Sequence, residues 1–401
     1  MRPIHIHTMR SSRHAVFALI SSDGPISKHK ISQKTGLSRP TVIEALNSLL
    51  ESDMVSYLEE KEAQQRGRIP RLYYLNPSYQ FGLGVDIGGS KILAGLTDLN
   101  GKIVAEIAEK TDSSGGENLI AQITSLRDRL VQIAGIESAR VAYGVIGMPG
   151  VPQSDGSVKF AENVEAIDNF NFKTALSNKL DVPLSLENDV NLGAVAELEN
   201  LSENENGTIA LVSIGTGIGM GLIIDRQLFK GAFGRAGEIG FVPIGSEPYT
   251  KKSHSQGFAE SKLSGIGLQK LYLESGTNEN LTGQEIFERY FIDEPTAVAV
   301  VEDYCGELAR LLVTISVIID PSVIILTGGI GSNEHIMTPL SKVFDSMNIF
   351  DVDIRQSQLK NRSGLLGALS LSRNFLAESL HRVPVYDPLA LDDPPVGVSS
   401  T

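Results

Sequence analysis

The sequence predicts an α/β protein with a winged helix-turn-helix head followed by a two-lobed body. Three observations lead to this prediction. Two short helical patterns joined by a glycine turn occupy residues 27–50. A segment of strand, glycine turn and strand occurs at residues 81–101 and returns at residues 209–224. The chain of 401 residues is also too long for one ordinary domain, and its 41% hydrophobic and 21% charged residues are typical of a globular protein.

The two helices of the head have recognisable ends. Ser27 is expected to cap the first helix, and Gly36 ends it because glycine readily adopts a positive backbone angle. Ser38 caps the second helix, and Pro40 lies in its first turn, where a missing N–H costs nothing. The apolar side chains of the second helix fall on one face, which is expected to turn inward: Val42, Leu46 and Leu49.

The opposite face of the second helix is polar. Recognition helices place such side chains against base edges and phosphates in the major groove of DNA. The alternative is a small helical hairpin whose polar residues are merely solvated. The predicted DNA contacts on this face are Ser38, Arg39, Thr41, Glu44 and Asn47.

A wing is predicted next to these helices. Residues 54–58 and 71–75 alternate apolar and polar side chains like two strands, and the loop between them carries Arg66 and Arg68. Both arginines are predicted DNA contacts, because such a loop can lie along the phosphate backbone or enter a narrow minor groove. Residues 1–75 hold 11 Lys and Arg against 7 Asp and Glu, whereas the remainder holds 24 against 41. A basic head on an acidic body fits a protein that touches nucleic acid through its head alone.

The body contains repeated glycine turns between apolar strands. Asp86 ends the first strand, and residues 88–90 form the turn. Backbone N–H groups in such turns can approach phosphate oxygens, and a neighbouring carboxylate can hold a metal ion bound to them. The second copy follows at an offset of 127 residues, which predicts two related lobes facing one another across a cleft. A third glycine cluster, at residues 327–331, can accommodate an adenine and ribose.

Other features limit the cellular setting. No apolar stretch is long enough to span a bilayer, and residues 1–12 lack the apolar core of a signal peptide, so we expect a cytoplasmic protein. The single cysteine, Cys305, is expected to be a small buried side chain. Residues 381–401 are rich in Asp, Pro and Ser and are predicted to form a poorly ordered tail.

The motifs together resemble the ROK family, named for repressors, open reading frames and kinases, in its transcriptional-regulator form. DIGGSK at 86–91, GTGIGMG at 215–221 and LTGGIG at 326–331 carry the resemblance, which runs over nearly the whole chain. It implies the actin-like ATPase fold that the family shares with hexokinases, and a protein that binds operator DNA until a sugar or sugar phosphate changes its affinity. The nucleotide-binding residues that it implies, if they are retained, are Asp86, Gly88, Gly89, Ser90, Lys91, Gly215, Thr216, Gly217, Gly328 and Gly329.

The resemblance also implies a sugar site. LENDVN at 186–191 is similar to the segment in which the family's kinases use the residue matching Asp189 to take a proton from a sugar hydroxyl, so Asp189 is catalytic if this chain is a kinase. The residue matching Asn188 holds neighbouring hydroxyls in those kinases. From the residues alone, a helix cap is an equally good interpretation of this pair. Further sugar contacts are implied at Asn163, Glu238 and Glu260, which without the resemblance are more typical of solvated surface.

The chain departs from the family at its zinc site. Most members bind one zinc ion through a histidine and three cysteines. Here Phe241 stands at the histidine position, and Lys251, Ser253 and Phe258 stand at the cysteine positions. A lone imidazole such as that of His254 is more typical of the surface than of a metal site. We therefore expect no structural zinc and no other metal.

These observations predict a cytoplasmic, sugar-responsive repressor of carbohydrate-utilisation genes that acts as a homodimer on operator DNA and requires no cofactor. The alternative is a sugar kinase that uses ATP and Mg²⁺. Against it, Met220 takes the place of a small residue in the second glycine turn, expected at residues 215–221, where a bulky side chain is expected to obstruct ATP. A third possibility is a head that binds a protein partner instead of DNA. The predicted divisions are a head at 1–76, a first lobe at 80–190 completed by a helix at about 360–380, and a second lobe at 191–359.

Overall fold

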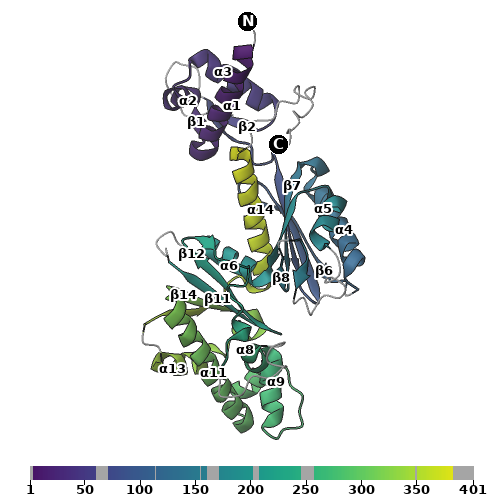
Figure 1. Cartoon of the computed structure of the whole chain (residues 1–401), viewed down its shortest axis with the longest axis vertical. Helices are drawn as coiled ribbons and strands as arrows, with labels where there is room; N and C mark the ends of the chain where they lie inside the picture. Colours follow the sequence, from purple (N-terminus) through teal and green to yellow (C-terminus); the bar gives the residue numbers. More distant parts are fainter. Residues whose placement is uncertain are drawn as a thin grey trace, which may run out of the picture. The chain divides into compact units, whose positions relative to one another are not determined.

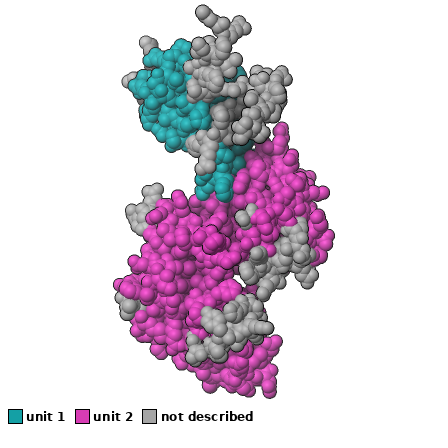
Figure 2. Space-filling model, in the orientation of Figure 1, with its two compact units in different colours: residues 1–82, 97–102, 373–401 teal, residues 83–96, 103–372 magenta. Residues whose placement is uncertain are grey.

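The computed structural model of the chain forms two compact units, which Figure 2 colours separately. Unit 1 comprises residues 1–82, 97–102 and 373–401, and unit 2 comprises residues 83–96 and 103–372. The residues that the structure describes are 3–59, 71–112, 114–153, 155–159, 171–201, 207–244, 257–347 and 350–382. Within these ranges, no helix is both long and apolar enough to cross a membrane.

The described part of unit 1 contains three complete helices, the end of a fourth, and a small sheet in which the strand order is β1-β3-β2. The elements are α1 (Pro3–Asp23), β1 (Ile26–Ser27), α2 (Lys28–Thr35), α3 (Arg39–Glu51), β2 (Val55–Glu59) and β3 (Arg71–Leu75). The predicted helix ends are confirmed. Ser27 accepts a hydrogen bond from the Lys30 N–H, Gly36 ends α2 with a φ of 70°, and Ser38 accepts from the Thr41 N–H.

The core of unit 1 is built on the predicted apolar face of α3. Leu46 and Leu49 are buried there against Val16 and Phe17 of α1. The sequence reasoning missed α1, whose buried apolar side chains in the described part, Val16, Phe17 and Ile20, span little more than one turn. Two residues distant in sequence from α3, Tyr79 and Leu380, also pack on this core.

The first sheet of unit 2 has the strand order β10-β7-β4-β5-β6. Its strands are β4 (Phe81–Ile87), β5 (Lys91–Thr97), β6 (Ile103–Lys110), β7 (Val141–Met148) and β10 (Leu184–Asn188), and β10 runs parallel to β7. A two-stranded antiparallel ribbon, β8 (Val151–Pro152) and β9 (Val158–Lys159), and a short helix, η1 (Ser138–Arg140), complete this half.

Side chains of β4 alternate between the two faces of the sheet, so alternate residues lie on the side of α14 (Ser363–Arg382). Leu83, Val85 and Ile87 are buried in the core beneath α4 (Gly116–Ala134) and α5 (Phe172–Leu180) (Figure 1). The residues between them face α14 instead. Gly84 is needed there, since a Cβ would lie 2.8 Å from Leu369 Cγ. Asp86 is therefore carried on the α14 side of the sheet.

The second sheet has the order β13-β12-β11-β14-β15, which repeats the pattern of the first. Its strands are β11 (Ile209–Ile214), β12 (Ile218–Ile224), β13 (Gln227–Leu228), β14 (Val323–Thr327) and β15 (Asp353–Gln356). In each half, a pair of strands joined by a glycine turn is extended on one side by two further strands. The prediction of a repeated unit is thus confirmed at the level of sheet topology.

Helices cover both faces of the second sheet. The helices of this part of the chain are α6 (Asp189–Asn200), η2 (Ile239–Phe241), α8 (Phe258–Leu263), α9 (Gly265–Glu274), α10 (Gly283–Phe291), α11 (Pro295–Ile319), α12 (Gly328–Gly331), α13 (Met337–Met347) and η3 (Lys360–Arg362). Ile209 and Leu211 pack with α6 on one face, while Val212 and Ile214 enter the larger core with α11 and α13 on the other.

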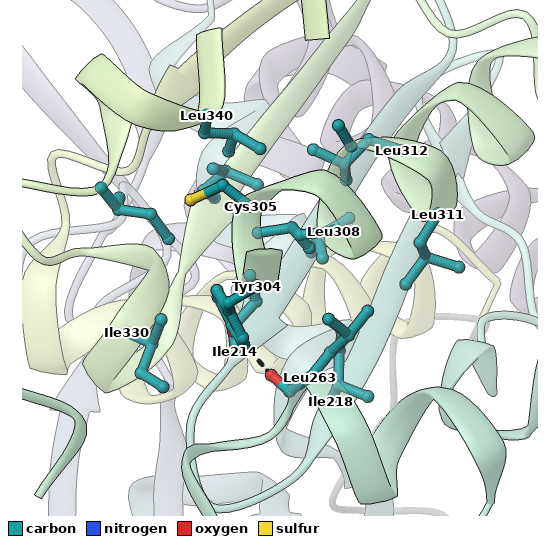
Figure 3. Packing of buried hydrophobic residues seen from close by; sticks show 14 of the residues in the cluster. Ile214, Ile218, Leu263, Tyr304, Cys305, Leu308, Leu311, Leu312, Ile330 and Leu340 are labelled. Carbon is teal, nitrogen blue, oxygen red and sulfur yellow. Dashed lines mark hydrogen bonds between the residues drawn. The ribbon is translucent and has the colours of Figure 1, made fainter. Parts of the chain in front are cut away.

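The larger core surrounds the middle of α11 (Figure 3). Cys305 is fully buried among apolar side chains, as predicted, and burial raises the pKa of its thiol to about 12. The neighbouring Tyr304 hydroxyl donates a hydrogen bond of 2.7 Å to the Leu263 carbonyl. This bond fixes α8, and hence one wall of the site, to α11.

The predicted C-terminal helix is confirmed as α14, which begins in unit 2 and ends in unit 1. The predicted tail lies outside the described residues except for the last residues of α14. The other domain divisions differ from the two compact units, because both sheets fall in unit 2. The assignment of one lobe to each sheet stays a prediction.

Candidate functional site

A cavity of ≈ 640 Å³ lies within unit 2, in the size range of small-molecule sites. Its walls come from the end of β10 and the start of α6, the β11–β12 turn, the segment after β13, and helices α8 and α9. Four of the predicted sugar contacts line it together: Asn188, Asp189, Glu238 and Glu260. The fifth, Asn163, lies outside the described residues.

The β10–α6 junction separates the roles of its two polar residues. Asn188 is the N-cap of α6, since its Oδ1 accepts hydrogen bonds from the N–H groups of Val190 (2.9 Å) and Asn191 (3.2 Å). Its Nδ2 donates to the Gly150 carbonyl at 3.0 Å. The helix cap considered for Asp189 is thus supplied by Asn188, whose amide keeps one N–H for a ligand.

Asp189 is the first residue of α6 and lines the cavity. Burial raises the pKa of its carboxyl group to about 6, while hydrogen bonds from backbone N–H groups oppose the shift. A carboxyl group whose pKa lies close to neutral can accept a proton from a hydroxyl or bind the hydroxyl as an acceptor. The position therefore suits either a base or a ligand contact.

Asp86 is electrostatically coupled to this site. Burial and the negative charge of Asp189 raise the pKa of Asp86 to about 7. The carboxylate lies against the start of α14, because a Cβ built on Gly364 would lie 2.5 Å from it. A Cβ on Gly147 of β7 would lie 3.5 Å from its Oδ1. Glycines thus make room for this carboxylate on two sides.

Two glutamates approach the same cavity from the second half of unit 2. Glu260 of α8 accepts a hydrogen bond of 3.2 Å from the Ile218 N–H, and a Cβ on Gly217 would lie 2.8 Å from its Oε2. Burial, and then the charges of Glu260 and Asp189, raise the pKa of Glu238. The negative charges of Glu260 and Asp189 therefore act on Glu238, and the positive charge of Arg235 opposes them.

The second glycine turn is shorter than predicted. Residues 215–217 form it, whereas Gly219, Met220 and Gly221 lie on β12. Met220 is 5% exposed and belongs to the hydrophobic core, so the structure corrects the expectation that its side chain occupies the turn. Gly221 allows β12 to approach α6, since a Cβ would lie 2.7 Å from the Val190 carbonyl oxygen.

The predicted nucleotide residues are only partly brought together. Gly215, Thr216 and Gly217 line the cavity. Gly215 also lies near the third glycine cluster, because its Cβ would be 3.8 Å from the Gly329 nitrogen. The residues predicted to bind nucleotide that do not line the cavity are Asp86, Gly88, Gly89, Ser90, Lys91, Gly328 and Gly329. Nucleotide binding stays a prediction.

Glu187 and Lys230 also line the cavity, and the sequence reasoning missed both. Glu187 is 4% exposed, and its carboxylate forms an ion pair with the Lys230 ammonium group. Glu187 lies inside the LENDVN segment and could have been suspected from that position. Lys230 follows a short strand in a glycine-rich stretch and gives no signal of its own.

The region where most members of the family bind zinc is only partly described in this chain, for which no zinc is predicted. Phe241 is 42% exposed and lines the cavity, while Phe258 is buried at 5% exposure. Lys251, Ser253 and His254 lie outside the described residues. Among the described side chains, no group of three or more His, Cys, Asp or Glu residues is placed to hold a metal ion.

The predicted DNA contacts of α3 lie on its outer face. Ser38, Arg39, Glu44 and Asn47 are exposed and Thr41 is half-buried. Arg66 and Arg68 of the predicted wing lie outside the described residues, but the strands that flank their loop, β2 and β3, pair antiparallel.

Both a known repressor and a known sugar kinase resemble this chain. A xylose repressor from Bacillus subtilis (strain 168) is 32% identical over 232 residues, which cover 56% of this chain and 58% of the repressor. The structure of a glucokinase from Streptomyces griseus, solved with glucose and AMPPNP, matches 73% of this chain and 99% of its own at 26% identity, with a TM-score of 0.61.

One solved structure matches the fold over nearly the whole chain. It is a ROK family transcriptional regulator, a homolog of the E. coli MLC protein, and it covers 94% of this chain and 98% of its own at 18% identity, with a TM-score of 0.70. The family model described as the ROK family matches residues 82–374, so the sugar-kinase-like body predicted from the motifs is confirmed. The chain belongs to the ROK family.

Proposed function

We propose that this protein is a DNA-binding transcriptional regulator, a repressor of carbohydrate-utilisation genes, whose operator affinity changes when a sugar occupies the cavity of unit 2. The observation that carries the proposal is the combination of two sites in one chain. A capped α2-turn-α3 pair with an exposed polar face precedes a three-stranded sheet, and a cavity lined by carboxylates and an amide lies in the body.

The head has the element order of a winged helix-turn-helix. In that arrangement α3 is the recognition helix, and Arg39, Glu44 and Asn47 face the duplex. The antiparallel β2 and β3 form the base of the wing, whose loop carries Arg66 and Arg68. A homodimer fits this function, since two recognition helices read two half-sites of a palindrome. A cytoplasmic location follows from the function.

The cavity suits a polyol. Asp189, Glu238 and Glu260 supply acceptors for hydroxyl groups, and Asn188 supplies a donor. The xylose repressor and the glucokinase similar to this chain are both named for sugars. Coupling to the head has a physical route, because α14 begins beside Asp86 and continues as one helix into unit 1. The strength of this switch is limited by the preference of the sugar for one conformation of the protein.

The proposal is tested with the full chain. Duplexes selected from a random library supply an operator, and gel shifts then measure affinity with and without D-xylose and D-glucose. We expect a selected sequence to bind at least about a thousandfold more tightly than random duplex, and one sugar to weaken that binding. A chain that binds no duplex preferentially, with or without sugar, is not such a regulator. If the affinity for DNA does not fall as the salt concentration rises, the result would support the alternative in which the head binds a protein partner instead of DNA.

A second candidate, an ATP-dependent sugar kinase, is favoured by one observation. Asp189 has a pKa near neutrality and shares the cavity with the glycine turn at residues 215–217. Asp189 would take the proton from the sugar hydroxyl, Mg²⁺ would be held by oxygen ligands such as the Asp86 carboxylate, and ATP would supply the phosphoryl group. Turnover of about 1 s⁻¹ or faster in an ADP-release assay over the same sugars would establish the kinase.

A further inference from the structure

Two large apolar side chains on the described walls of the cavity are exposed. Phe241 of η2 and Ile266 of α9 both line the cavity. Phe241 remains 42% exposed after its own contacts are made, and Ile266 is 65% exposed. Neither belongs to the larger core around α11, whereas Ile218 and Met220 on the cavity wall are buried in that core. The exposed parts of Phe241 and Ile266 are therefore available to a ligand.

Phe241 lies beside the Glu260 carboxylate. A Cβ on the preceding residue, Gly240, would lie 3.4 Å from Glu260 Oε2. The same segment approaches the start of α8 closely, since a Cβ on Gly257 would lie 2.3 Å from the Gly240 carbonyl oxygen and 3.2 Å from the Phe241 nitrogen. The backbone of Phe241 is thus packed next to a hydroxyl acceptor of the cavity.

Ile266 borders the same part of the cavity from α9. The preceding residue, Gly265, donates a hydrogen bond of 2.7 Å from its N–H to the Gly215 carbonyl in the glycine turn. Glu260 approaches that turn as well, because a Cβ on Gly217 would lie 2.8 Å from its Oε2. Apolar surface and a carboxylate acceptor therefore occur together in one region of the cavity.

A free sugar is poorly matched to this region. A sugar hydroxyl placed against Phe241 or Ile266 would lose water without gaining a hydrogen-bond partner, which is unfavourable. An apolar substituent at the same place gains free energy by leaving water, and an aromatic substituent can also stack on the phenylalanine ring. The side chain of Lys270, on the same helix as Ile266, is 64% exposed and would favour a phosphate ester instead, so a phosphate ester is the competing ligand in the test.

We propose that Phe241 and Ile266 form an aglycone subsite, so that the ligand of the cavity is a glycoside whose apolar substituent lies against these two side chains. The sugar ring is then bound by the carboxylates predicted as sugar contacts. The cavity volume of ≈ 640 Å³ is compatible with such a ligand, because sites of roughly 300–1,000 Å³ bind drug-sized molecules. This inference rests on the proposed function, because it names the class of sugar to which the regulator responds.

The experiment compares methyl and phenyl glycosides by calorimetry on the full chain. The ligands are the α and β forms of the D-glucopyranosides and D-xylopyranosides, so each pair shares its sugar and its anomeric configuration, and D-glucose 6-phosphate is added as the charged competitor. In at least one pair, the phenyl glycoside is expected to bind about tenfold more tightly than the methyl glycoside, because it buries more apolar surface.

Substitutions then locate the subsite. Phe241→Ala is expected to reduce the phenyl-to-methyl ratio to about twofold and to leave the affinity for the methyl glycoside within about twofold of the natural value. Phe241→Leu keeps an apolar side chain and is expected to retain part of the preference. Ile266→Ala is expected to lower the ratio less, and it supplies the measurement if the melting temperature shows that Phe241→Ala does not fold. Ile318→Ala, an exposed apolar residue of α11 that does not line the cavity, is the matched control.

A ratio near one for every pair in the natural chain overturns the inference, as does a ratio that neither Phe241→Ala nor Ile266→Ala lowers. Tighter binding of D-glucose 6-phosphate than of every phenyl glycoside also overturns it. Gel shifts with the selected operator separate the inference from the proposed function. If free sugars release DNA and phenyl glycosides act no better, the regulator stands and the subsite falls. If phenyl glycosides bind through Phe241 but no sugar changes operator affinity, the subsite stands and the regulator falls.

Discussion

The carboxyl groups of Asp86 and Asp189 interact across the end of β4 and the start of α6. Burial and the charge of Asp189 raise the pKa of Asp86 to about 7, and burial raises the pKa of Asp189 to about 6. Each folded value lies above the unfolded value of 3.8, so between these values the folded chain binds more protons than the unfolded chain. The stabilising effect of protonation is complete below pH 3.8 and is lost as the pH rises through about 6 to 7.

Replacing Asp86 by Asn is therefore expected to stabilise the protein near neutral pH. The amide cannot ionise, so Asp86→Asn removes the cost of a buried negative charge, on the order of 4 kcal/mol at pH 7.5 for the shift from 3.8 to about 7. Urea denaturation at several pH values measures the effect, which is expected to shrink toward pH 4. Asp345→Asn on the exposed face of α13 is the control. An equal gain at pH 4 and pH 7.5 contradicts the explanation by charge.

Asp189→Ala is expected to abolish the response to sugar and leave DNA binding intact. The substitution removes a charged hydrogen-bond acceptor from the cavity, which corresponds to a loss of at least about tenfold in sugar affinity. Gel shifts with and without the active sugar measure both properties. Asp303→Ala on the exposed side of α11 is the matched control. If the Asp189 variant releases DNA at the normal sugar concentration, the sugar lies elsewhere.

Arg39→Ala is expected to weaken operator binding by about tenfold or more, without changing the affinity for sugar. Arg39 is exposed at the start of α3, where recognition helices meet the duplex. If Arg39 contacts a phosphate, its loss would reduce the number of ions released on operator binding, and hence the salt dependence of the affinity, by about one. If Arg39 contacts a base, its loss would relax the preference for that base at one operator position. Arg310→Ala on α11 removes an exposed arginine from unit 2 as a control. Identical operator affinities of the Arg39 variant and the natural chain would remove α3 from the interface.

Gly237→Ala is expected to distort the wall of the cavity that carries Glu238. Gly237 has a φ of 90°, and its Cβ would lie 1.8 Å from the Met220 carbonyl oxygen. Gly234 has a φ of 71° but nothing within 4 Å of a Cβ, so Gly234→Ala carries only the backbone strain, about 1 kcal/mol. The difference in sugar affinity and melting temperature between the two variants isolates the steric clash. Equal losses would show that the wall yields without cost.

Local chemistry made much of the fold predictable. Ser27, Gly36 and Ser38 each satisfy a backbone requirement that only a few residue types meet, so the ends of α2 and the start of α3 followed from the sequence. The two glycine turns predicted the repeated sheets for a similar reason. In contrast, α1 had too short an apolar repeat to be recognised, although Val16 and Phe17 complete the core of unit 1.

The candidate site was predictable where a single residue type carries the chemistry. Asp189, Glu238 and Glu260 were identified from motifs and line one cavity, although their roles remain predictions. The ion pair of Glu187 with Lys230 was not predictable, because it depends on a contact between segments 43 residues apart in the sequence. Similarly, nothing in the motif itself showed that Met220 would lie on β12, outside the turn, with its side chain in the larger hydrophobic core.

The packing of Tyr79 and Leu380 on the core of unit 1 has a practical consequence for the isolated head. A fragment that stops at residue 76 would lack both side chains and expose part of its apolar core to water, which favours self-association. Adding a synthetic peptide that spans the last turns of α14 is expected to restore its solubility. The unit proposed to bind DNA is thus completed by a segment synthesised some three hundred residues later.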